Sequence, residues 1–216
     1  FIVYALFGRN LPGVLAHRNV SVRQLVDHLF FTTEGIFGIP LGVSSTFVFM
    51  FLLFAAFIEI TGVGKLFIDL GNAIAGWASG GPAKVAVITS AFEGMVEGSS
   101  VSNVVGSGSF TIPMMKKLGY RPEFAGAVEA AASTGGQLMP PIMGAAAFLM
   151  AEILGIPYLE VVKAAAIPAA LYFIGIFAGV HFEAKKLGLR GMPRGQLPGF
   201  WQILKTEGVL FIPLVG

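Results

Sequence analysis

Residues 83–120 read AKVAVITSAFEGMVEGSSVSNVVGSGSFTIPMMKKLGY, two apolar arms on either side of a short polar centre at Gly98, Ser99 and Ser100. Each arm has about 15 to 20 residues, whereas a helix that crosses a bilayer needs about 20 apolar ones. Irregular backbone at membrane depth survives only where it lines a cavity or is buried in protein. The stretch therefore predicts a re-entrant helical hairpin with a polar tip.

A second polar interruption lies in the middle of the apolar stretch 122–155, where residues 133–141 read STGGQLMPP. A glycine pair and a proline pair inside a helical stretch predict that the helix is broken into two halves. Pro140 and Pro141 fit the first turn of the second half, because the N–H groups that proline lacks have no helical partner there.

The composition indicates a membrane protein. Of the 216 residues, 55% are hydrophobic and 12% are charged, whereas a soluble domain carries about 25% charged residues. Three stretches of bilayer length contain no Asp, Glu, Lys or Arg: 36–58, 130–151 and 164–182. A soluble protein with a very apolar helical core is the alternative, and the low charge disfavours it. We expect a multi-pass protein of a bacterial or archaeal cytoplasmic (inner) membrane.

Several classes of function lack support in the sequence. The chain has no cysteine, which excludes a disulfide framework and thiolate metal sites. It has no basic run that would indicate nucleic-acid binding, and no Ser/His/Asp or metal-ligand cluster that would indicate an enzyme. We therefore expect a protein that is not an enzyme and needs no organic cofactor.

The pattern of apolar and polar stretches predicts an all-α membrane protein in six segments. The chain begins and ends within apolar runs, so we expect it to be a fragment of a longer protein. The segments are 1–37, the end of a preceding helix and an interfacial segment; 38–79, a transmembrane helix and a surface helix; 80–120, the re-entrant hairpin; 121–156, the broken transmembrane helix; 157–195, a transmembrane helix and a cytoplasmic loop; and 196–216, the start of a truncated transmembrane segment.

Basic residues predict the orientation. One cluster follows the hairpin and another follows the last complete span, two crossings later, so both lie on one side of the membrane. By the positive-inside tendency that side is cytoplasmic. Three arginines before the first span disagree with this orientation: Arg9, Arg18 and Arg23.

The two polar interruptions predict an ion or substrate site if they meet near the middle of the membrane. Half-helix N-termini favour an anion, whereas unwound carbonyls and half-helix C-termini favour a cation such as Na⁺. Polar residues that could cap these ends or supply oxygens are Ser99, Ser100, Asn103, Thr134 and Gln137. The alternatives are an ordinary loop at the first interruption and a structural kink at the second, but two together favour a site.

Two carboxylates precede the tip of the hairpin. Glu93 and Glu97 are four residues apart and so share one face of a helix. A carboxylate within a membrane is costly and is a candidate for function. One hypothesis is that one of them binds a cation or a proton, and the alternative is that both are solvated at the water-exposed side of the hairpin.

Three motifs resemble the large membrane subunit of tripartite ATP-independent periplasmic (TRAP) transporters, especially the type fused to the small subunit. They are GGPAKVAV at 80–87, EGSSVSNVVGSGSFTIPMMKKLGY at 97–120 and EAAASTGGQLMPPIMGAAAFLMAE at 129–152, and the resemblance extends over about residues 4–190. It implies the first half of an inverted-repeat elevator transporter. It also implies Na⁺ coupling, a small membrane subunit, and a periplasmic binding protein that delivers a small organic acid.

The resemblance also implies site residues. By position in the motifs it assigns Gly98, Ser99, Asn103, Gly135 and Gly136 to a Na⁺ site. The residues of the two interruptions add Thr134 to those expected to hold Na⁺, and Ser99, Ser100, Gln137 and Pro140 are expected at the substrate. The chain departs from the family at Glu93 and Glu97, where small or neutral residues are expected. Two other functions stay open: a hairpin-type Na⁺/carboxylate symporter without a binding protein, and a membrane scaffold subunit that transports nothing.

Overall fold

The regular elements in the described part of the chain are all helices, as expected. The computed structural model describes residues 1–211 except Asn19, Arg194 and Gln196, so the expected segment 196–216 lies only partly within it. The chain divides into two compact units, Phe1–Val48 and Phe49–Gly216.

The first unit consists of short helices. Its longest, α2, begins after Ser21, whose side chain accepts a hydrogen bond from the backbone N–H of Gln24 in a capping box. A serine at this position stabilises the first turn of a helix by about 1 kcal/mol. The elements are α1 (Ile2–Phe7), η1 (Gly8–Asn10), η2 (Gly13–Leu15), α2 (Val22–Phe31), α3 (Ile39–Val43) and the π-helical η3 (Ser44–Val48).

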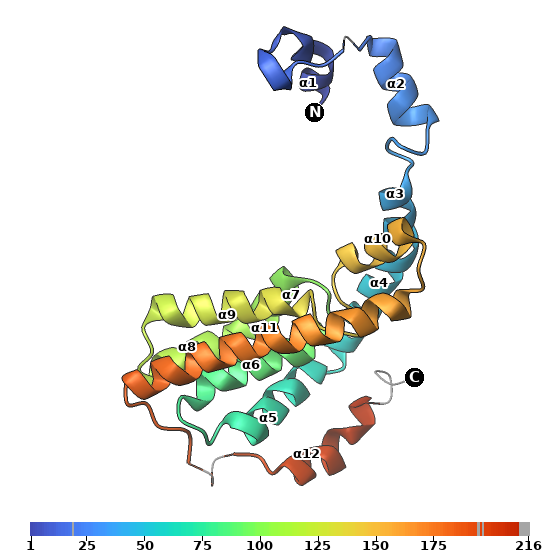
Figure 1. The fold of residues 1–216 in the computed structure, drawn as a ribbon. Coiled ribbons are helices and arrows are strands. Elements are labelled where there is room, and N and C mark those ends of the chain that lie inside the picture. The colour runs from blue at the N-terminus through green and yellow to red at the C-terminus, as the bar shows by residue number, and fades with distance from the viewer. Residues whose placement is uncertain (19, 194, 196, 212–216) are drawn as a thin grey trace. The chain divides into compact units, whose positions relative to one another are not determined.

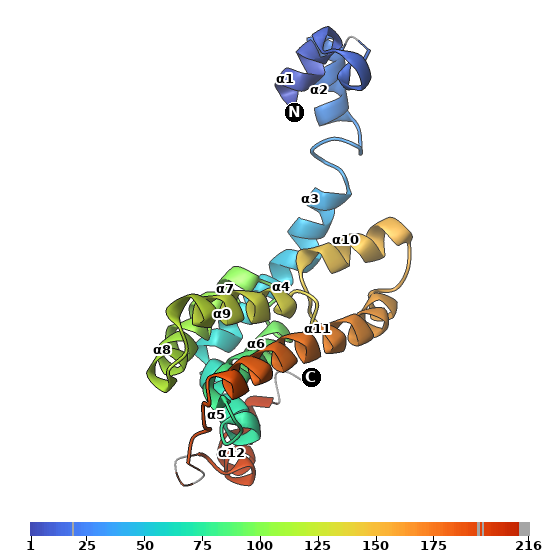
Figure 2. The same ribbon diagram turned by 60° about the vertical axis from the view of Figure 1, so that its left-hand side comes forward.

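The second unit contains the hairpin and the broken helix. In Figure 1 and Figure 2, α6, α9 and α11 lie side by side, and all three pack against one another. The elements are α4 (Phe49–Ile60), α5 (Val63–Ala75), α6 (Gly81–Gly94), α7 (Ser100–Gly106), α8 (Gly108–Leu118), α9 (Pro122–Gly136), α10 (Ala145–Leu154), α11 (Tyr158–Lys186), α12 (Phe200–Glu207) and η5 (Gly208–Phe211).

Two segments are long and apolar enough to cross a bilayer, Ile39–Ile58 and Tyr158–Lys186. Only 11% of the apolar window of each is buried within the described structure. A soluble protein would bury such surfaces against other elements, so their exposure fits a membrane protein.

The hydrophobic core of the second unit packs together α6, α9 and α11, and so includes helices that adjoin both polar interruptions. Its buried side chains are small on α6 and α9, including Ala83, Ala86, Ala125 and Ala132, and larger ones such as Phe173 and Val180 cover them from α11. Small residues let helix backbones approach closely, which is the usual basis of helix packing in membranes.

The hairpin region forms two packed arms, α6 and the pair α7–α8, joined by a turn at residues 95–99. The second arm is interrupted at Ser107, between α7 and α8. Gly119, with φ +109°, ends α8 in the left-handed conformation that favours glycine.

Helix α5 lies within the predicted segment 38–79, and its position at the membrane surface stays a prediction. One face of α5 is buried, with Leu66, Phe67 and Leu70 each at most 4% exposed, and the helix packs against α6. Helix α5 is too short to span a bilayer, and its amphipathic pattern places its apolar face against the first arm of the hairpin.

The broken helix is present, but the break lies later than expected. Ser133 to Gly136 are the last turn of α9, so the irregular segment runs from Gln137 to Gly144. The prediction that Pro140 and Pro141 start the second half is wrong, since α10 begins at Ala145. The Tyr158 hydroxyl instead lies within hydrogen-bond distance of two backbone oxygens of the irregular segment, that of Ile142 and, at 3.0 Å, that of Pro141.

The expected C-terminal membrane segment is described only at its start. Helix α12 has eight residues, FWQILKTE, and places Ile203 in a core with Leu66 and Phe67 of α5. Residues 212–216, where the apolar run continues, lie outside the described part of the chain.

Candidate functional site

The hairpin tip and the broken helix meet. Gln137 Nε2 donates a 2.8 Å hydrogen bond to Ser100 Oγ, which joins the end of α9 to the start of α7. Gly98 lies against the irregular segment that follows α9, because a Cβ at this position would be 1.9 Å from the backbone oxygen of Met143. The C-terminal ends of α6 and α9 and the starts of α7 and α10 are thus brought together.

Two of the predicted tip residues have local roles. Ser99 is the N-cap of α7, and its Oγ accepts a 3.3 Å hydrogen bond from the backbone N–H of Ser102. Ser100 is half-buried and holds Gln137 as described above.

Asn103 is the most deeply buried of the predicted site residues with a polar side chain, at 1% exposed. Its Nδ2 donates to the backbone oxygen of Ser90 at 2.9 Å, and its Oδ1 accepts from Ser133 Oγ at 2.9 Å. The side chain of Asn103 therefore joins α7 to both α6 and α9.

Glycines allow α6 and α9 to touch at their C-terminal ends. A Cβ on Gly94 would lie 2.3 Å from Gly136 Cα, and a Cβ on Gly136 would lie 3.1 Å from both Gly94 Cα and Asn103 Nδ2. Gly136 is therefore at the meeting point, as its assignment to the site requires.

Three predicted residues lie to the side of this point. Gly135 faces α11, where its Cβ would be 2.6 Å from Tyr172. Thr134 is exposed and donates a 2.7 Å hydrogen bond back to the carbonyl of Ala130. Pro140 is half-buried within the irregular segment.

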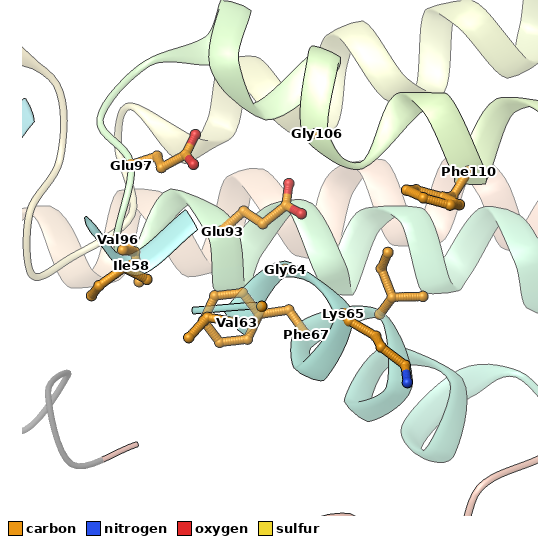
Figure 3. A pocket seen from close by; sticks show the side chains of 12 residues that line it. Ile58, Val63, Gly64, Lys65, Phe67, Glu93, Val96, Glu97, Gly106 and Phe110 are labelled. Carbon is orange, nitrogen blue, oxygen red and sulfur yellow. The ribbon is translucent and has the colours of Figure 1, made fainter. Parts of the chain in front are cut away.

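A pocket of about 460 Å³ opens beside the hairpin and is lined by Glu93 and Glu97. Figure 3 shows the Glu93 side chain extending toward Gly106, and a Cβ there would be 3.8 Å from either carboxylate oxygen. Glu93 is 7% exposed and Glu97 is half-buried, and both face this pocket, so the choice between ion binding and solvation stays a prediction. The other walls, such as Val63, Phe67 and Phe110, are mostly apolar.

The most deeply buried carboxylate among the described side chains is not one of the predicted site residues. Glu129 of α9 is 0% exposed and contacts three hydroxyls, from Ser107, Thr111 and Ser133. A signal was present in the sequence, because Glu129 is the one charged residue of the apolar stretch 124–151, and the residues of each pair, Ser107/Thr111 and Glu129/Ser133, are four apart.

A family model described as "Tripartite ATP-independent periplasmic transporter, DctM component" matches residues 1–215. The chain belongs to this TRAP transporter family. The resemblance inferred from the three motifs is thereby confirmed, and the family is one of transporter permeases.

Curated relatives carry the same family name. The chain is 31% identical to the C4-dicarboxylate TRAP transporter large permease protein DctM of Pseudomonas aeruginosa over 82% of its length and 39% of that protein. It is 27% identical to the protein of the same name from Vibrio cholerae over 94% of its length and 43% of that protein.

A fused relative is similar as well. The isethionate TRAP transporter permease protein DctMQ of Oleidesulfovibrio alaskensis is 26% identical over 76% of the chain and 26% of that protein. The chain therefore spans less than half the length of these TRAP permeases.

Proposed function

We propose that this chain forms part of the translocating unit of a Na⁺-coupled TRAP permease that takes up a small organic acid. The observation that supports this most is the meeting of the hairpin tip with the broken helix, through Gln137 and Ser100 at 2.8 Å. Substrate and ion sites of secondary transporters are typically formed by discontinuous helices, and this chain has two irregular segments in contact.

A cation suits this meeting point. The C-terminal ends of α6 and α9 touch at Gly94 and Gly136, and helix C-termini carry partial negative charge. Residues 98–103 and 133–141 contain no Lys or Arg that would compete with a cation. We assign the coupling Na⁺ to this region, with Gly98, Ser99, Asn103 and Gly136 at its centre and Thr134 and Gly135 at its periphery.

The substrate of the complete permease is proposed from chemistry that its relatives share. Two relatives are named for C4-dicarboxylates and one for isethionate, all of them small organic anions. Ser99, Ser100, Gln137 and Pro140 surround the contact between the two interruptions and are assigned to the substrate. A periplasmic binding protein would deliver the substrate, and a small membrane subunit, separate or fused, would complete the permease in the inner membrane.

The test is uptake of a C4-dicarboxylate by the complete permease in proteoliposomes, with and without a Na⁺ gradient and the binding protein. We expect uptake to need both. We also expect Ser99→Ala to raise the half-saturating Na⁺ concentration about tenfold, which corresponds to loss of about 1.4 kcal/mol. The matched control is Ser109→Ala, since Ser109 is exposed on α8 and its hydroxyl donates to the nearby backbone oxygen of Gly106.

Other outcomes would select the alternatives. Uptake that needs the gradient but no soluble protein would indicate a hairpin-type symporter. A complete permease that transports none of a panel of organic acids would support the scaffold function, in which Ser99→Ala has no effect.

The pocket carboxylates make a separate prediction. If one of them binds the coupling cation or a proton, Glu93→Gln or Glu97→Gln changes the dependence of uptake on Na⁺ or pH. Both residues line the same pocket, so uptake is measured for each single variant and for the double variant. Uptake with unchanged Na⁺ and pH dependence in all three variants would contradict this role.

A further inference from the structure

Glu129 has surroundings that the proposed transport site leaves unexplained. Its Oε1 lies 2.6 Å from Ser107 Oγ, and its Oε2 lies 2.5 Å from Thr111 Oγ1. Gly108 makes room for it, because a Cβ at this position would be 3.1 Å from Glu129 Cγ. The carboxyl group is thus enclosed between α9 and the junction of α7 with α8.

No ion pair to Glu129 exists among the described residues. Helices α6, α7, α8 and α11 pack against α9. Helix α7 has no charged residue, the charges of α8 are in its exposed last turn, and those of α11 lie toward its two ends. On α6, Lys84 bonds His181 at 2.9 Å and Glu93 faces the pocket. The charged groups on these elements are Lys84, Glu93, Lys116, Lys117, Glu123, Glu160, Lys163, His181, Glu183, Lys185 and Lys186.

The hydroxyl protons around Glu129 are too few for the contacts present. Thr111 Oγ1 has one proton but lies within 3.0 Å of two oxygens, Glu129 Oε2 and the backbone oxygen of Ser107. If Glu129 is ionised, one of these contacts has no proton. If Oε2 carries a proton and donates it to Thr111, then Thr111 donates to Ser107 and both contacts are hydrogen bonds.

Ser133 connects this carboxyl group to Asn103. Its Oγ lies 2.9 Å from Asn103 Oδ1 and 3.4 Å from Glu129 Oε1, so its single proton can serve either oxygen. A hydrogen bond to an ionised acceptor is stronger than one to a neutral acceptor. Ionisation of Glu129 would therefore turn the Ser133 hydroxyl from Asn103 to the carboxylate.

We propose that Glu129 is a proton-binding site, protonated in this arrangement, whose proton is released when the coupling cation binds beside Asn103. Release of the proton turns Ser133 toward Glu129 and frees Asn103 Oδ1 to face a cation. A buried carboxyl group without a cationic partner is stable in its neutral form, which accounts for the protonated state. The linkage to the cation rests on the proposed function, whereas protonation of Glu129 does not.

Infrared spectroscopy of the purified complete permease tests protonation directly. A neutral carboxylic acid gives a carbonyl stretch that an ionised carboxylate lacks, and we expect this band at neutral pH. Glu129→Gln should remove it. Two variants should retain it: Glu123→Gln, an exposed glutamate of the same helix, and Glu93→Gln at the pocket.

A band that is absent, or that persists in Glu129→Gln, would overturn the proposal. Thr111→Val provides a second readout if the Gln variant does not fold, because it removes the hydrogen-bond partner of Oε2. The band should then move to higher frequency, and an unmoved band would contradict the assignment.

Calorimetry of Na⁺ binding to the same protein tests the linkage. Coupling is reciprocal, so a proton that Na⁺ displaces must weaken Na⁺ binding. We expect the dissociation constant for Na⁺ to rise about fivefold or more from about pH 8 to about pH 6. In Glu129→Gln, which is neutral at both values, the constant should equal that of the wild type at low pH.

The outcomes separate the two proposals. Na⁺ binding that is independent of pH, with the infrared band present, would overturn the linkage alone. Na⁺ binding that is undetectable at both pH values would overturn the linkage together with the proposed Na⁺ coupling. Protonation of Glu129 would then be decided by the infrared band alone.

Discussion

Gly94→Ala is expected to lower the free energy of unfolding of the permease by about 3 kcal/mol and to abolish uptake. The new Cβ would lie 2.3 Å from Gly136 Cα, and a backbone atom cannot rotate away as a side chain can. Helices α6 and α9 would have to separate at the ends that meet in the proposed site. Thermal unfolding of the purified protein and uptake in proteoliposomes measure the two effects.

Gly126→Ala is the matched control, because Gly126 is a helical glycine of α9 with no atom within 4 Å of its would-be Cβ. Alanine in place of an unconstrained helical glycine stabilises a protein by up to about 1 kcal/mol. If Gly94→Ala were tolerated as well as Gly126→Ala, the close approach of α6 and α9 would be wrong.

The existence of the two interruptions could be predicted from the sequence because their residues are unfavourable in an apolar helix. Glycine, serine and proline at 98–100 and 133–141 conflict with a continuous span. The family could be recognised for the same reason, since these unusual residues form long specific motifs.

The position of the second break could not be predicted from the same residues. The sequence predicts Gly135 and Gly136 as part of the break, but both lie in the last turn of α9, where their missing side chains make room for Tyr172 and for Gly94. Glycine serves close packing as well as flexibility, and a sequence alone does not show which partner approaches.

The role of Glu129 depends on contacts between distant segments. Ser107 and Thr111 precede it by 22 and 18 residues, and only the packing of α8 on α9 brings their hydroxyls to the carboxyl group. In the sequence, Ser107 and Thr111 are four residues apart, as are Glu129 and Ser133, so each pair shares one face of a helix. This spacing does not indicate that the two faces meet.

Asn103→Asp is the second variant with a large expected effect, a loss of about 3–5 kcal/mol in the free energy of unfolding at neutral pH. Asn103 is 1% exposed, and its Nδ2 donates to the backbone oxygen of Ser90. Aspartate removes this donor and adds a buried carboxyl group that shares Ser107 and Ser133 with Glu129. Asn10→Asp, at an exposed asparagine, is the control and should change stability by at most about 0.5 kcal/mol.

The pH dependence of Asn103→Asp shows whether burial or the lost hydrogen bond causes the effect. A carboxyl group that is ionised when unfolded but must be neutral when buried opposes folding above its unfolded pKa, and this opposition fades as the pH falls. The variant should therefore regain stability relative to the wild type on acidification, whereas Asn103→Leu, which loses the same donor without adding a charge, should not. Equal pH dependence of the two variants would mean that residue 103 is solvated, and the junction of α6, α7 and α9 described here would be wrong.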